Sequence, residues 1–120
     1  MSNLDKELEK TLFQIIASSG ESKNKLFEAI EAYQKGNYEK KDRILKEAEE
    51  LVVDANKLLF ELVKREAQGE KIPLSILLIH SMDILMSSIT TREIVTQLTK
   101  KPRTKIGKSQ SLGTSNYKTD

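Results

Sequence analysis

The sequence contains a single histidine, His80, and an aspartate follows it three residues later, Asp83. A histidine side chain has an ordinary pKa of about 6.5, so a neutral imidazole is available at pH 7 as a nucleophile, a general base or a metal ligand. The structural alternative is a half-buried histidine that bonds to a helix carbonyl or to Asp83, a common role for such residues. The pair therefore marks where chemistry is expected without fixing its kind.

Asp83 stands among apolar residues, where a carboxylate is costly to bury unless it is paired, hydrogen-bonded or bound to a metal. If copies of the chain meet around Asp83, the carboxylates repel one another or recruit a cation, and hard oxygen ligands suit Mg²⁺ or a similar divalent ion. Otherwise Asp83 faces water or orients His80. The hydroxyls of Ser87 and Thr91 are candidate donors to a transferring group, although hydroxyls on helices more often contact water or their own backbone.

Other chemistry has little support in the sequence. The chain has no cysteine, which excludes a disulfide framework, a thiolate metal site and a cysteine nucleophile. It also contains no glycine-rich phosphate loop, no dinucleotide fingerprint and no zinc-helix motif. The enzyme classes that depend on these motifs are excluded with them.

Helices are the elements expected to position the pair. The chain has 120 residues, 38% hydrophobic and 32% charged, as expected of one small helical domain. Apolar residues three or four apart predict a first helix from Leu4 to Tyr33, and Ser18-Ser19-Gly20 in its middle predicts a kink or a close helix contact. Gly36 followed by Asn37 predicts a tight turn, with Gly ending one helix and Asn capping the next.

The second helix, from Tyr38 to about Gly69, has the most regular pattern. Its apolar residues recur every seven positions, and charged residues occupy the other face. The apolar columns are Leu45, Val52 and Leu59; Ile44, Leu51 and Leu58; and Ala48, Ala55 and Leu62. Pro73 predicts the first position of a third helix that extends to about Lys100.

The third helix has two apolar faces. At about 100° per residue, one face holds Leu74, Leu78, Met82, Leu85 and Ile89, and the opposite face holds Ile76, Ile79, Met86 and Ile94 with Asp83. Two partner helices cover only one face well, so the second face requires another copy of the chain. We therefore predict an all-α, antiparallel three-helix bundle that self-associates, with the column Ile76, Asp83, Thr90 and Gln97 at the symmetry axis.

Residues 101–120 differ in composition from residues 1–100. They hold five basic residues, one acidic residue and few apolar ones, so we expect a disordered tail after the helical domain. Such scattered basic residues are typical of a soluble terminus, and residues 1–100, with 15 basic and 17 acidic side chains, offer no broad surface for nucleic acid. The apolar stretch Leu74–Met86 is too short to cross a membrane, and the acidic N-terminus is unlike a targeting segment. We expect a cytoplasmic protein.

The residues from Leu77 to Met86, LLIHSMDILM, resemble the segment LLVHAQDHLM of the IIA component of the lactose/cellobiose family of the bacterial phosphoenolpyruvate-dependent sugar phosphotransferase system. The similarity includes Phe13–Gly20, the turn Lys35–Tyr38 and the turn Glu66–Lys71. It covers about residues 4–100 in register.

This resemblance implies a parallel homotrimer of three-helix protomers, a nine-helix bundle. It also implies that His80 is the catalytic residue, which accepts a phosphoryl group from the phosphohistidine of HPr and passes it to a cysteine of the IIB component, in support of sugar uptake by the membrane IIC component. Asp83 would then lie at the trimer axis as the ligand of a metal ion bound between subunits.

Three positions depart from the family pattern. Met82 and Ile84 stand where the family commonly has glutamine and a second histidine, and Phe60 ends a stretch that is more polar in the family. Fewer donors around a phosphohistidine slow phosphoryl transfer. The alternative function is therefore a non-catalytic trimeric helical module that binds or regulates another protein.

Overall fold

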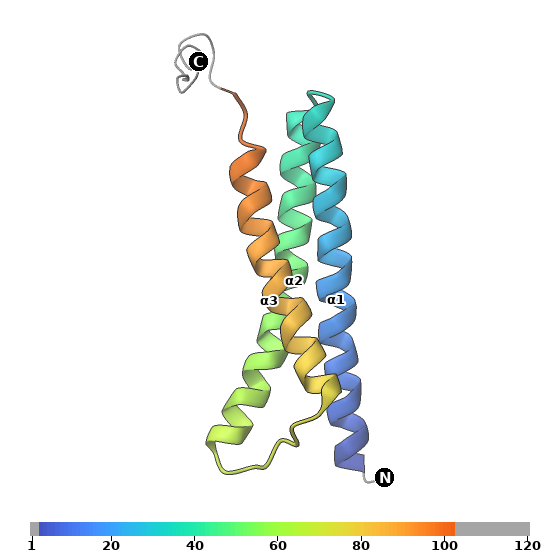
Figure 1. Ribbon diagram of the computed structural model, residues 1–120, viewed down its shortest axis with the longest axis vertical. Helices are drawn as coiled ribbons and strands as arrows, with labels where there is room; N and C mark the ends of the chain where they lie inside the picture. The colour runs from blue at the N-terminus through green and yellow to red at the C-terminus, as the bar shows by residue number, and fades with distance from the viewer. Residues whose placement is uncertain (1–2, 103–120) are drawn as a thin grey trace.

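The computed structural model describes residues 3–102, with side chains from Lys6 onward. It contains α1 (Asn3–Gln34), α2 (Tyr38–Ala67) and α3 (Ile76–Leu98), and no strand within the described range. Helices α1 and α2 run side by side in opposite directions, and α3 returns across them in the same direction as α1 (Figure 1). The predicted all-α antiparallel three-helix architecture is confirmed. Most of the predicted tail, from residue 103 onward, lies outside the described residues.

The turn between α1 and α2 has the predicted chemistry. Gly36 has φ of +78°, a left-handed conformation that glycine adopts without steric cost. The Oδ1 atom of Asn37 then accepts a hydrogen bond of 3.2 Å from the backbone N–H of Lys40 and caps α2. Gly and Asn therefore reverse the chain within three residues.

Helix α1 is uninterrupted at Gly20, so the kink that we considered there does not break it. The close helix contact is present instead. A Cβ atom added to Gly20 would lie 3.9 Å from Cδ1 of Ile84, which is ordinary van der Waals contact with α3. The glycine therefore marks where α3 crosses α1.

The predicted start of α3 at Pro73 is wrong. The helix begins at Ile76, and Ser75 is its N-cap, with an Oγ atom that accepts a 3.1 Å hydrogen bond from the backbone N–H of Leu78. A serine hydroxyl satisfies one of the free N–H groups of the first turn, which proline at the first position does not do. Leu74 consequently precedes the helix and is 82% exposed, instead of packing on the inner face.

The apolar core follows the third predicted column of α2. Ala48, Ala55 and Leu62 are all buried, whereas in the flanking column Val52 is buried but Leu45 and Leu59 are only partly covered. Two clusters form around them, one at each end of the bundle. The first contains Leu12, Ile15, Val52, Ala55, Leu62 and Leu85, and the second contains Leu26, Ala48 and Val95.

Serine residues connect the helices between these two clusters. The hydroxyl of Ser88 donates a 2.8 Å hydrogen bond from α3 to the backbone oxygen of Ser19, and the hydroxyl of Ser22 donates a 2.9 Å bond from α1 to the oxygen of Ala48. Ser19, Ser22 and Ser88 are completely buried. Small side chains let the backbones approach, and the carbonyl groups satisfy two of the three hydroxyls.

Ion pairs reinforce the bundle at its edges. Lys25 of α1 lies 3.1 Å from Glu47 of α2, and this hydrogen bond lowers the pKa of the Glu47 carboxyl and raises the pKa of Lys25. In the last turn of α2, the guanidinium of Arg65 donates a 3.0 Å hydrogen bond from Nε to Glu70 and lowers the pKa of that carboxyl. The second pair closes the turn at Gly69, where φ is +102°. No helix within residues 3–102 has the length and hydrophobicity to span a membrane.

Two serine substitutions test the seam between α1 and α3. Ser88→Ala leaves the Ser19 carbonyl without its side-chain donor and should lower the free energy of unfolding by about 1 kcal/mol. Ser19→Ala is the matched control, because the buried Ser19 hydroxyl has no hydrogen-bond partner within the described part of the chain, so its removal should be neutral or stabilising. Urea unfolding measures both variants. Equal losses in the two would contradict the hydrogen-bond assignment.

Candidate functional site

His80 lies in the second turn of α3, and its ring is exposed. The preceding turn is fixed by two serine hydroxyls: Ser75 accepts from the N–H of Leu78, and Ser81 donates a 2.8 Å bond to the Leu78 oxygen. The hydrogen bonds of the described residues include none between His80 and Asp83. Within one chain, the imidazole is therefore presented to solvent on a rigid helix, and the half-buried structural role is not formed.

Asp83 lies about 60° around α3 from His80 and is also exposed. The rest of its column, Ile76, Thr90 and Gln97, is exposed as well. Large apolar side chains flank this column without cover from α1 or α2. These flanking residues are Ile79, Met86 and Ile94, and Ile76 of the column itself is 86% exposed.

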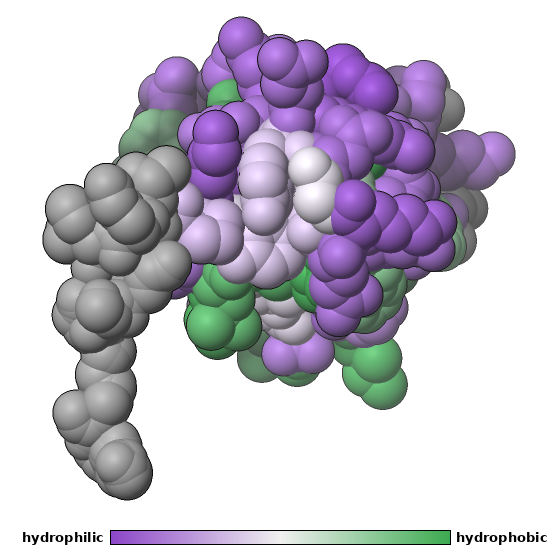
Figure 2. All heavy atoms as spheres, turned by 90° about the horizontal axis from the view of Figure 1, so that it is seen from above, coloured by the Kyte–Doolittle hydropathy of each residue, from purple (hydrophilic) through white to green (hydrophobic). Residues whose placement is uncertain are grey.

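We name the uncovered side of α3 the open face. In order around the helix, it holds Met82, Met86, Ile79, Asp83 and His80. Seen from above the bundle, hydrophobic side chains gather along one side of the molecule while hydrophilic ones cover most of that end (Figure 2). The second apolar face predicted for α3 is thus uncovered in the single chain. His80 lies at the α1 edge of the open face, and Asp83 lies nearer its middle.

The inner face of α3 differs from the predicted one. Leu85 is buried and Leu78 and Ile89 are partly buried, as predicted, but Met82 is 42% exposed. The closest packing is made by Ser81 and Ser88, both fully buried. Large side chains cannot occupy the line along which α1 and α3 approach most closely, so the inner face is rotated toward these serines.

The described residues of a single chain do not form a metal centre. No cluster of three His, Cys, Asp or Glu side chains that could hold a metal ion occurs among the described residues. Each chain does contribute Asp83 as an exposed hard oxygen donor, beside the exposed apolar side chains of Ile79 and Met86. That donor set fits a divalent cation such as Mg²⁺ only where several copies bring their carboxylates together.

The candidate hydroxyls have different surroundings. Ser87 lies two turns after His80 on the same side of α3, and its Oγ atom accepts a 3.2 Å hydrogen bond from Nζ of Lys23 on α1. Thr91 is half-buried one turn further along. Lys23 was not predicted, because a lysine on a helix surface carries no sequence signal that separates it from a solvated one.

The two departures in the motif, Met82 and Ile84, face different neighbouring helices of the same chain. Ile84 packs toward Gly20 of α1, and Met82 lines a cleft between α2 and α3 together with Leu59, Val63 and Leu78. Met82 lies about 160° around the helix from His80. Ile84 therefore packs within the chain one turn after His80, whereas Met82 is only partly covered and lies nearly opposite the imidazole.

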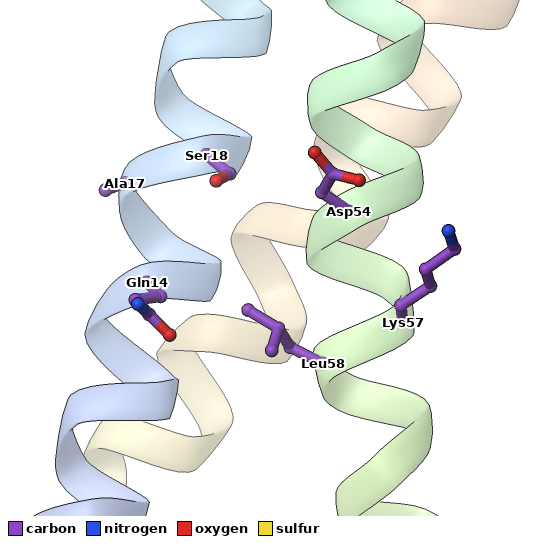
Figure 3. A pocket seen from close by; sticks show the side chains of 6 residues that line it. All are labelled: Gln14, Ala17, Ser18, Asp54, Lys57 and Leu58. Atoms are coloured by element: carbon purple, nitrogen blue, oxygen red, sulfur yellow. The ribbon is translucent and has the colours of Figure 1, made fainter.

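A separate groove lies between α1 and α2, on the side of the bundle away from α3 (Figure 3). It has a volume of about 460 Å³ and is lined by Gln14, Ala17, Ser18, Asp54, Lys57 and Leu58. Two of the lining residues, Lys57 and Leu58, belong to the stretch 55–60, which ends at Phe60 and is more polar in the family. His80 is not among its lining residues.

The sequence matches a known family over most of its length. The profile of the family described as "PTS system, Lactose/Cellobiose specific IIA subunit" matches residues 10–101. The lactose-specific EIIA component of Streptococcus mutans is 37% identical over 86 residues, which are 72% of this chain and 83% of the relative. The lichenan-specific phosphotransferase enzyme IIA component of Bacillus subtilis is 32% identical over 95 residues, 79% of this chain and 86% of the relative.

Solved structures agree with the sequence comparison. The crystal structure of the PTS cellobiose-specific enzyme IIA from Bacillus anthracis superposes with a TM-score of 0.75 at 32% sequence identity, and covers 82% of this chain and 87% of that one. The similarity therefore includes the arrangement of the three helices as well as the sequence.

Proposed function

Because the chain belongs to the lactose/cellobiose-specific IIA family of the sugar phosphotransferase system, we propose that it is a phosphocarrier in sugar uptake and that His80 is its phosphoryl acceptor. The donor is the phosphohistidine of HPr, and the acceptor downstream is the IIB component, both in the cytoplasm. The observation that supports this role most directly is an exposed histidine, the only one in the chain, on the open face of α3.

The transfer to His80 is a nucleophilic displacement at phosphorus. A nitrogen lone pair of the His80 imidazole forms the new N–P bond while the N–P bond of the donor breaks, and the donor imidazole keeps that electron pair. The carrier then holds the phosphoryl group on His80 until a cysteine thiolate of the IIB component attacks the phosphorus. The new S–P bond forms as the N–P bond breaks, and the His80 imidazole keeps that electron pair. Such transfers depend mainly on positioning and on charge stabilisation, so a rigid, exposed imidazole suffices on the carrier side.

Incubation with phosphoenolpyruvate, enzyme I and HPr tests this proposal. We expect the intact mass of the chain to increase by one phosphoryl group, and the increase to disappear in His80→Ala. Asp83→Asn is the matched control, since it alters the same helix face but leaves the imidazole.

An unchanged mass, under conditions that label a IIA protein of known activity, would contradict the phosphocarrier. It would instead favour the non-catalytic module, for which the apolar contacts of Met82 with α2 and of Ile84 with α1 are the supporting feature. Labelling that persists in His80→Ala would show that another residue is the acceptor.

We further propose that three copies assemble through their open faces, with Asp83 at the axis. Association would cover Ile76, Ile79 and Met86, whose exposure is costly in a soluble protein. It would also bring the Asp83 carboxylates together, where a divalent cation such as Mg²⁺ offsets their repulsion. His80, at the edge of the face, would stay within reach of partner proteins.

Metal removal tests the role of Asp83. A chelator should lower the Tm of the unmodified protein by about 5 °C or more, because ligand binding to the folded assembly alone stabilises it. Asp83→Asn should show no response to the chelator, since the amide lacks the charge that recruits the ion. The same chelator response in both proteins, or none in either, would contradict a metal at Asp83.

A further inference from the structure

One cation crosses from α1 to the side of α3 that carries His80. Nζ of Lys23 donates its 3.2 Å hydrogen bond to Oγ of Ser87, and both side chains are half-buried. The ion pairs formed among residues 6–102 do not include Lys23. Its charge is therefore held in a fixed place by a neutral hydroxyl.

The position of this cation relative to His80 follows from helix geometry. Ser87 lies seven residues after His80, about 10 Å along the helix axis and about 20° around it. A protein–protein interface of ordinary size covers about 800 Å² on each partner, which corresponds to a radius of roughly 16 Å. A partner interface of this size that is centred on His80 therefore covers Lys23 as well.

Direct contact between Lys23 and the transferred phosphoryl group is not favoured by this geometry. Side chains on an α-helix lean toward its N-terminus, which directs the His80 ring away from Ser87. The ammonium group thus lies at the protein–protein contact and not at the phosphorus. A partner that covers Lys23 removes water from its ammonium group. An acceptor of opposite charge on the partner compensates for that lost hydration.

We propose that Lys23, positioned by Ser87, is a specificity-determining residue that pairs with a carboxylate on the phosphoryl donor protein. This inference rests on the proposed function. The change of charge on transfer favours the donor over the acceptor: before transfer, no phosphoryl group lies near Lys23, and its ammonium group attracts an acidic surface. After transfer, a phosphoryl group with about two negative charges lies nearby and offsets that attraction, which promotes release of the spent donor.

The test compares the second-order rate of phosphoryl transfer from phosphorylated HPr for three proteins. Lys23→Glu should lower this rate about tenfold at low salt, and the difference should shrink as salt rises, because the attraction acts over a Debye length of about 10 Å at 0.1 M. Ser87→Ala should lower it two- to threefold, since Lys23 keeps its charge but loses its fixed place. Lys46→Glu, at an exposed position on α2, is the control with the same change in net charge.

The outcomes separate this inference from the proposed function. If the unmodified protein is not phosphorylated, the proposed function fails. If it is phosphorylated and Lys23→Glu reacts at the same rate, or is slowed equally at every salt concentration, the docking role of Lys23 is overturned. Sedimentation of each variant completes the test, because dissociation of the assembly by Lys23→Glu would place Lys23 at a contact between copies and also overturn the inference.

Discussion

The third helix is apolar around most of its circumference, but a chain of three helices provides only two neighbours to cover it. Helix α1 packs against the side that holds Ile84 and Ser88, and α2 packs against the side that holds Leu78 and Leu85. The remaining arc is the open face. Because the Asp83 carboxylate and the His80 imidazole are part of that arc, the same constraint that leaves α3 partly uncovered also leaves these two groups accessible.

Several elements of the fold follow from the sequence by simple physical rules. The repeat of α2 predicted three apolar columns, of which only Ala48, Ala55 and Leu62 are buried throughout. The Gly36–Asn37 turn was predicted from the conformational freedom of glycine and the capping ability of asparagine. These features are local. Their stereochemistry depends on a few neighbouring residues, so no knowledge of the partner helices is needed.

The contacts between helices were less accessible to prediction. Ser19, Ser22 and Ser88 are polar residues that a helical pattern assigns to solvent, yet they are fully buried because carbonyl groups of neighbouring helices accept from Ser22 and Ser88. The start of α3 was misplaced because Pro73 and Ser75 are both typical of a helix N-terminus. For the site, His80 and Asp83 were found from residue type and spacing, whereas Lys23 depends on a contact between residues 64 positions apart.

The open face unites the proposed chemistry and the proposed assembly: its middle would join copies of the chain, and its α1 edge would present the imidazole. The chain has no cysteine, so a single spin label can be attached at Thr90→Cys on the proposed axis, with Glu61→Cys on an exposed part of α2 as reference. Pulsed electron resonance then measures the separation between labels on different copies. The account predicts a clearly shorter separation at Thr90 than at Glu61, and equal separations, or no dipolar coupling at Thr90, would contradict it.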